Sequence, residues 1–179
     1  MKEFNNKEVI IIAGPSASGK SYIIRQLKTT KKNKLKSKIF RKLSINSRKS
    51  KSCISISALK NSSKKPKHIR KLKKKVIFIH FDLTGRHQKQ KRQLLLQVSK
   101  DCKKIKILTV NTPFNIWRER MQNRFRLNLV SIHKNDATRI FKLSKYFYFL
   151  AEWRYNLIYR EWSDFTASIA PNKKFLVDN

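Results

Sequence analysis

The stretch Gly14–Ser21, GPSASGKS, follows the β-branched run VIIIA at Val9–Ala13 and satisfies the pattern G-x-x-x-x-G-K-[ST] in full. Gly14 and Gly19 permit a tight turn and a close backbone approach that side chains would block. Two of the chain's three glycines lie in this stretch. Because the motif stands between an apolar run and helix-forming residues, it predicts a phosphate-binding loop between a buried strand and a helix.

The residues of this loop have separate expected roles toward a nucleoside triphosphate. We expect successive backbone N–H groups, together with the positive end of a helix that begins near Lys20, to point at the anionic oxygens. The Lys20 ammonium would lie beside the β- and γ-phosphates, and the Ser21 hydroxyl would bind Mg²⁺. The ligand is then ATP or GTP with Mg²⁺, and the predicted binding residues are Gly14, Pro15, Ser16, Ala17, Ser18, Gly19, Lys20 and Ser21.

Strand and helix patterns alternate along the rest of the chain. Further strands are expected at Cys53–Ser57 as an edge strand, Val76–Asp82, Ile105–Val110 and Lys174–Val177. Helices are expected at Lys20–Leu27, Gln88–Ser99, Phe114–Arg126 and Ala137–Thr166. Thr112 is the expected N-cap of the third of these helices, with Pro113 at its first position. This order predicts an α/β fold with a mainly parallel sheet and helices on both faces.

Asp82 ends the apolar run VIFIHFD. The carboxyl ends of parallel strands meet at the ligand-binding edge of a sheet, so we expect Asp82 on the same rim as Gly14. Its carboxylate can hold Mg²⁺ through water or accept a proton from an attacking hydroxyl. The structural alternative is a turn aspartate that caps the next helix. His80, in the same run, is assigned to the core as a hydrogen-bonded histidine.

Arginines are concentrated on the helix expected after Thr112. Arg120 and Arg124 are four residues apart and therefore share one face of it. Two guanidinium groups that project together can neutralise charge on a transferring phosphoryl group. The alternative is a solvated basic face. The predicted catalytic residues are Lys20, Asp82, Arg120 and Arg124, and the predicted metal ligands are Ser21 and Asp82.

The formal net charge of +34 is unevenly placed along the chain. The segment Lys28–Lys75 contains twenty Lys and Arg and no acid. Such a block is typical of a surface that binds phosphates or nucleic acid non-specifically, or of a solvated, partly disordered insertion. We expect a flexible basic insertion at 28–75 within a single domain spanning 1–179, with little regular structure over 28–51. Phe40 is the segment's one aromatic residue, which disfavours recognition of single strands by base stacking.

Several protein classes are disfavoured by the sequence. No apolar run approaches the length that a membrane-spanning helix needs. The first residues lack the small-residue cleavage site of a signal peptide, and Cys53 and Cys102 have no metal-binding or redox spacing. We therefore expect a cytoplasmic protein without a membrane span.

Four segments resemble the P-loop kinase group of NTPases, which includes nucleotide kinases and other small-molecule kinases. They are GPSASGKS, VIFIHFD, ILTVNTPFNIWRERMQNR and KFLVDN. The resemblance implies a three-layer P-loop NTPase fold with the basic insertion after the first helix. In this group an Arg-bearing helix leads into a lid whose arginines approach the phosphates. The resemblance implies that role for Arg120 and Arg124, with Arg118 as a further candidate.

Within that group, CISISALK and FDLTG are similar to segments of guanylate kinases. The Thr-Thr-Arg run and the acidic residues that guanylate kinases use to read the base are absent from Ala58–Lys75. GMP is therefore not predicted as the acceptor.

Three functions are compatible with these patterns. The first is a kinase-like enzyme that transfers the γ-phosphoryl group of ATP or GTP to a small-molecule or nucleotide acceptor. The second is a nucleic-acid-associated NTPase or binding module that uses residues 28–75. The third is a sulfotransferase-like protein that binds a sulfonucleotide through a related loop, although the Gly-Lys-Ser ending favours a triphosphate with Mg²⁺. Residues 58–75 and 126–170 contain nothing that identifies the acceptor.

Overall fold

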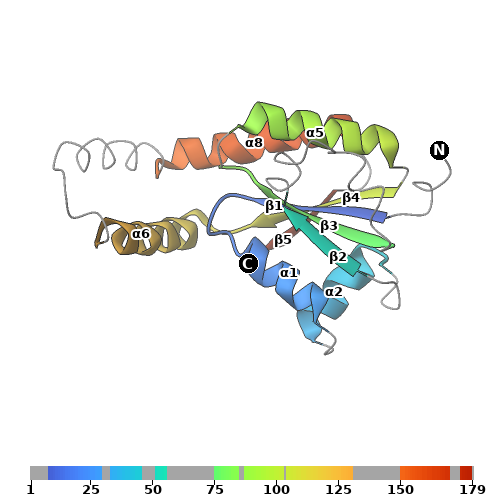
Figure 1. Ribbon diagram of the computed structural model, residues 1–179. Coiled ribbons are helices and arrows are strands. Elements are labelled where there is room, and N and C mark those ends of the chain that lie inside the picture. The colour runs from blue at the N-terminus through green and yellow to red at the C-terminus, as the bar shows by residue number, and fades with distance from the viewer. Residues whose placement is uncertain are drawn as a thin grey trace.

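The computed structural model of the protein describes residues 8–29, 33–45, 51–55, 75–84, 87–102, 104–130, 150–169 and 174–178. The strands are β1 (Glu8–Gly14), β2 (Lys51–Ser55), β3 (Val76–Asp82), β4 (Lys104–Asn111) and β5 (Lys174–Asp178). The helices are α1 (Lys20–Lys28), α2 (Lys34–Lys42), α5 (Gln88–Asp101), α6 (Phe114–Val130) and α8 (Glu152–Ile169). Figure 1 shows their arrangement. Across these ranges, no helix is long and apolar enough to cross a membrane.

The strands form one sheet in the order β2-β3-β1-β4-β5, and every pairing is parallel. β1 is central, and all seven of its residues are buried. This burial explains why its sequence is continuously apolar rather than alternating. In the register of β1 and β3, Gly14 lies opposite Asp82. The end of the glycine-rich loop and the acid therefore meet at the carboxyl edge of the sheet.

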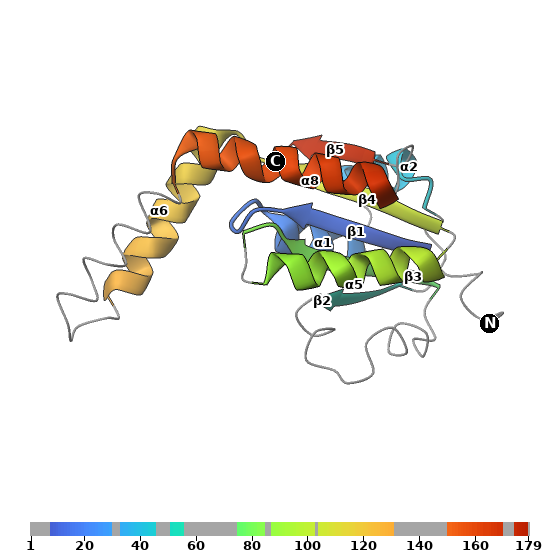
Figure 2. The same cartoon turned by 90° about the horizontal axis from the view of Figure 1, so that it is seen from above.

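Two hydrophobic clusters lie on opposite faces of this sheet. Alternate residues of a strand point to opposite faces, so Ile11 packs toward α5 and α8, whereas Ile10 packs toward α1 and α2. Figures 1 and 2 show α5 and α8 side by side on one face and the α1–α2 pair on the other. The predicted α/β architecture, with a parallel sheet and helices on both faces, is confirmed.

The prediction of little regular structure over 28–51 is wrong for Lys34–Lys42. This segment is helix α2, and the side chain of its N-cap, Asn33, accepts a hydrogen bond from the Lys36 amide at 2.7 Å. Ile39 and Phe40 on α2 are buried against the sheet. The sequence pattern did not indicate this short amphipathic helix, because the apolar residues of α2 are few and closely spaced among many basic ones. β2 lies at the sheet edge, as expected, but begins two residues before the predicted strand.

The start of α6 differs from the expected cap. The Pro113 carbonyl accepts the first helical bond, from the Trp117 amide at 2.9 Å. Pro113 therefore takes the N-cap position expected for Thr112, and the Thr112 hydroxyl donates to the Ser18 carbonyl at 3.1 Å. Figure 2 shows α6 extending away from the sheet beyond the end of β4. Thr112 thus connects this helix to the glycine-rich loop.

Side-chain hydrogen bonds join helix α8 to the carboxyl end of β4. The Tyr159 hydroxyl donates to the Val110 carbonyl at 2.7 Å, and the Trp162 indole N–H donates to the Thr109 hydroxyl at 2.9 Å. The described helix begins at Glu152. The part of the expected helical region that covers 137–149 lies outside the described residues.

Candidate functional site

The loop between β1 and α1 is compact and contains two residues in the left-handed region. Gly19, the N-cap of α1, has φ 89°, and Ala17 has φ 64°. Glycine adopts such angles at no steric cost, whereas alanine does so rarely. The Ser18 amide donates to the Pro15 carbonyl at 3.2 Å and closes a turn inside the loop. The backbone of the motif is therefore held in a specific, partly strained conformation.

Gly14 is required by close packing rather than by its torsion angles. A Cβ atom at this position would lie 2.5 Å from the Ser18 hydroxyl oxygen and 3.0 Å from the Val110 carbonyl oxygen. Real Cβ atoms essentially never approach another heavy atom as closely as the first of these distances. The first glycine of the motif thus lets the loop fold back against β1 and β4.

Hydrogen bonds to distant parts of the chain hold the loop in place. The Thr112 hydroxyl donates to the Ser18 carbonyl, the buried Trp117 indole donates to the Ser16 carbonyl at 2.8 Å, and the Ser16 amide donates to the Thr84 hydroxyl at 2.9 Å. The expectation that successive loop amides face the ligand is therefore corrected for Ser16 and Ser18, whose amides have protein acceptors. No spacing in the sequence indicates these bonds.

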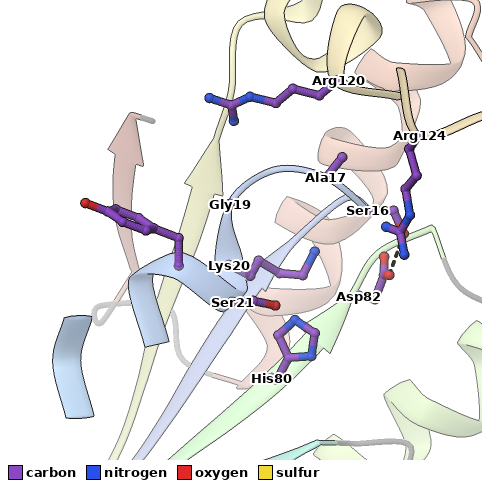
Figure 3. A pocket seen from close by; sticks show the side chains of 10 residues that line it. Ser16, Ala17, Gly19, Lys20, Ser21, His80, Asp82, Arg120 and Arg124 are labelled. Atoms are coloured by element: carbon purple, nitrogen blue, oxygen red, sulfur yellow. Dashed lines mark hydrogen bonds between the residues drawn. The ribbon is translucent and has the colours of Figure 1, made fainter. Parts of the chain in front are cut away.

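A cavity of about 590 Å³ opens beside the loop (Figure 3). It brings together most of the predicted site residues with two that were not predicted. Gly14, Pro15 and Ser18 do not line the cavity but build the loop beneath it. The lining residues are Ser16, Ala17, Gly19, Lys20, Ser21, Tyr22, His80, Asp82, Arg120 and Arg124.

Lys20 is buried, and its ammonium donates to the Pro15 carbonyl at 2.5 Å. Burial lowers the pKa of Lys20 to about 8, the attraction of Asp82 opposes this change, and repulsion from Arg124 adds to it. A positive charge is thus kept in a partly desolvated position at the cavity wall. Anionic oxygens placed there would gain a strong interaction, because the charge has already lost much of its hydration.

The Asp82 carboxylate is a hydrogen-bonded centre at the end of β3. It accepts from the Ser16 hydroxyl at 2.6 Å, drawn dashed in Figure 3, and from the Thr84 amide at 2.9 Å and hydroxyl at 2.8 Å. Burial raises the pKa of Asp82, but the charge of Lys20 and these hydrogen bonds together hold it below its ordinary value. Asp82 is therefore ionised at neutral pH. It does not cap α5, whose N-cap is His87.

The two predicted arginines on α6 are placed differently, although both line the cavity. In Figure 3 the guanidinium of Arg124 points toward Ser16 and Asp82, whereas that of Arg120 points away from them. The charge of Arg124 also acts on the pKa of Lys20. Arg118 is exposed and does not line the cavity. The pair shares a helix face, as predicted, but Arg124 is the member directed at the acid.

His80 lies in the cavity wall rather than in the core, which corrects the sequence prediction. Burial lowers the pKa of His80, the charge of Lys20 adds to this change, and attraction to Asp82 opposes it. The ring is therefore neutral at pH 7. Its position two residues before Asp82 was the available signal, since alternate strand residues face the same side. Tyr22, which directly follows the Gly-Lys-Ser ending, was also missed.

The cavity offers oxygen ligands suited to Mg²⁺. The Ser21 hydroxyl and the Asp82 carboxylate both line it. In the described ranges no group of three His, Cys, Asp or Glu side chains could hold a metal ion. Mg²⁺ in enzymes that act on phosphates takes most of its ligands from water and phosphate oxygens, so one hydroxyl and one carboxylate fit this ion.

Comparison with known proteins gives little independent information. No family model matches the chain, and no curated protein matches it. Among solved structures it is similar to one titled "Crystal structure of APE1195", with 13% sequence identity and a TM-score of 0.42 over 73% of this chain and 74% of that chain. A similarity of this size carries no argument about function.

Proposed function

We propose that the chain is a P-loop NTPase of the kinase type, which binds ATP or GTP with Mg²⁺ at Gly14–Ser21 and transfers the γ-phosphoryl group. The observation that carries the proposal is the convergence of Lys20, Asp82 and Arg124 on one cavity beside this loop. Two cations and one ionised acid, supplied by three different elements, match the charges of a triphosphate with its metal ion.

The order of the strands supports this proposal over a dinucleotide-binding enzyme. In the doubly wound orders 3-2-1-4-5-6 and 2-1-3-4-5, the second strand in sequence pairs with the first. Here β3 stands between β2 and β1, so the strand that ends in Asp82 is the direct neighbour of the strand that leads into the loop. The acid can then reach a metal ion bound to phosphates on the loop.

The residues have complementary tasks in the proposed reaction. An acceptor oxygen attacks the γ-phosphorus, the bond from the γ-phosphorus to the bridging oxygen breaks, and the nucleoside diphosphate leaves. Lys20 and Arg124 neutralise the charge that develops on the phosphoryl oxygens. Asp82 would hold Mg²⁺ through water or take the acceptor's proton, and the Ser21 hydroxyl would ligate Mg²⁺ directly. When bound, Mg²⁺ would neutralise the β- and γ-phosphate oxygens.

A thermal-shift series tests the ligand class. ATP–Mg²⁺ or GTP–Mg²⁺ at about a hundred times its Kd stabilises the fold by about 2.7 kcal/mol, a rise in Tm of roughly 5–10 °C. Lys20→Ala should abolish the rise. A sulfonucleotide that raises Tm when neither triphosphate does would instead favour the sulfotransferase-like alternative. No shift with any of the three would refute the proposal.

A matched pair of variants tests the placement of the arginines. Arg124→Gln and Arg120→Gln make the same change on the same helix, four residues apart. Because Arg124 is the one directed at Asp82, its loss should lower kcat for nucleotide hydrolysis by about a hundredfold, and the loss of Arg120 by much less. Equal losses of kcat in the two variants would contradict the assigned role of Arg124.

A further inference from the structure

The outer surface of α1 and α2 is basic and contains no acid. Its exposed cations are Arg25 and Lys28 on α1 and Lys34, Lys38, Arg41 and Lys42 on α2, and we refer to this set as the basic face. The two helices pack on the same face of the sheet (Figure 1). No Asp or Glu occurs in the sequence between Glu8 and Asp82, so no carboxylate of these helices offsets the cations.

The opposite helical layer has a different charge pattern. Helix α8 bears exposed acids, and one of them, Glu161, pairs with Arg92 of α5 at 3.2 Å. Cations and acids therefore occur together on the layer formed by α5 and α8, whereas the basic face has one sign. Among the described residues, one side of the sheet thus bears a helical surface of unopposed positive charge, which attracts a polyanion.

The described part of the basic face has few exposed apolar side chains that could insert into a membrane. The large apolar residues of α2, Ile39 and Phe40, are buried against the sheet. Among the described residues the exposed large hydrophobic side chains are Tyr22, Ile116 and Trp153, and Tyr22 alone belongs to α1 or α2. A surface that inserts into lipid combines cations with several exposed apolar side chains. These helices instead present cations beside a single aromatic ring.

Tyr22 provides that ring at the point where the basic face meets the cavity. Its side chain lines the cavity and is 46% exposed. The Arg25 guanidinium lies 5.8 Å from the centre of the ring, three residues further along the helix. An exposed aromatic ring beside cations is the arrangement on which unpaired bases stack while their phosphates are neutralised. Phe40, the one aromatic residue of the basic segment, is buried, so Tyr22 is the residue placed for stacking.

We propose that the basic face binds a single-stranded nucleic acid, with phosphates on its cations and a base stacked on Tyr22. This inference rests on the surface and not on phosphoryl transfer, so it stands or fails separately from the proposed function. If both hold, a strand on the basic face reaches the cavity where the triphosphate binds. The nucleotide stacked on Tyr22 then lies beside the loop Gly14–Ser21.

Fluorescence anisotropy with a labelled oligothymidylate of about 16 nucleotides tests the electrostatic part. The triple variant Lys34→Gln, Lys38→Gln, Arg41→Gln removes three cations from the basic face. Each lost phosphate contact reduces the slope of log K against log salt by about 0.7, so affinity at about 0.1 M salt should fall roughly a hundredfold and the slope by about 2. The thermal shift with ATP–Mg²⁺ should be unchanged, which separates this test from that of the proposed function.

A matched control removes the same charge from the other layer. Lys89→Gln, Lys100→Gln and Arg160→Gln replace exposed cations on α5 and α8 and should leave affinity and slope close to wild type. Equal losses in the two triple variants would show that net charge alone attracts the strand and would overturn the proposal. Failure of the wild-type protein to bind the oligonucleotide would overturn it as well.

Tyr22 is tested by a pair of substitutions. Tyr22→Ala should weaken oligonucleotide binding about fivefold or more, while Tyr22→Phe, which keeps the ring, should bind as wild type does. The salt slope should be the same in both, because stacking releases no counterions. Unchanged binding by Tyr22→Ala would refute stacking. Binding to vesicles of anionic phospholipid without binding to the oligonucleotide would assign the basic face to a membrane surface instead.

Discussion

The buried charge of Lys20 should make the stability of the ligand-free protein depend on pH in a way that Lys20→Met removes. Burial lowers the pKa of Lys20 from 10.5 to about 8 in the folded protein, against the opposing attraction of Asp82. Unfolding returns the side chain to water and to its ordinary pKa. Between these two values the unfolded chain binds more protons than the folded one, so stability rises with pH. The stability gained from a neutral Lys20 is fully present above the pKa of Lys20 in the unfolded chain. It is lost as pH falls through the pKa of about 8 in the folded protein.

The size of the effect follows from the same two values. Their difference corresponds to about 3 kcal/mol at 1.36 kcal/mol per pH unit, and about 2 kcal/mol of it is regained between about pH 7 and about pH 10. For a chain of this length, each kcal/mol changes Tm by about 2–4 °C. The Tm of the wild type relative to that of Lys20→Met should therefore rise by about 4–8 °C over this range.

Thermal unfolding of both proteins, followed by circular dichroism at several pH values, measures this difference. The other lysines and the tyrosines titrate in both proteins and cancel in the comparison. Saturating ATP–Mg²⁺ should flatten the dependence, because phosphate oxygens beside Lys20 stabilise its charged form. Parallel Tm curves for the two ligand-free proteins would refute the reasoning, since Lys20 would then carry no desolvated charge.

Two further substitutions test how the loop is packed. Gly14→Ala places a Cβ 2.5 Å from the Ser18 hydroxyl oxygen and 3.0 Å from the Val110 carbonyl, so the free energy of unfolding should fall by about 1–3 kcal/mol. Thermal unfolding should show that Ser18→Ala recovers part of this loss, and an unchanged Tm in the single variant would contradict the packing. Trp117→Phe removes the hydrogen bond from the indole to the Ser16 carbonyl. The free energy of unfolding should therefore fall by about 1–3 kcal/mol, which lowers Tm. The affinity for ATP–Mg²⁺, measured by calorimetry, should fall as well. If neither quantity changes, Trp117 does not support the loop.

The elements that the sequence predicted well are those with a local signal. Val9–Ala13 is apolar at every position because β1 is buried on both faces of a parallel sheet, and the same pattern located β3 and β4. The glycine-rich motif lies where its glycines indicated, because its torsion angles and its internal turn are set within a few residues. α2 was missed because buried apolar side chains are few among its many lysines.

Other parts of the site depend on residues far apart in the sequence. Asp82 and Ser16 are 66 positions apart, and Trp117 bonds to Ser16 across 101 positions. No periodicity specifies which strand pairs with β1, so the sequence predicted that Asp82 and Gly14 share a rim but not that they are directly opposite. His80 differs from these cases, because its alternation with Asp82 along one strand was a local signal for its place in the cavity wall.

The sequence by itself determined where the glycine-rich loop Gly14–Ser21 forms, because glycine torsions and a strand-to-helix transition are local properties. Tertiary structure alone decided what surrounds that loop. The pairing of β3 with β1 places Asp82 and His80 in the cavity wall. The position of α6 points Arg124 toward Asp82. The packing of α1 and α2 on one face of the sheet brings the cations of the basic face together. These placements follow from burying apolar side chains on both faces of one sheet, an energy that depends on the whole chain rather than on any short segment.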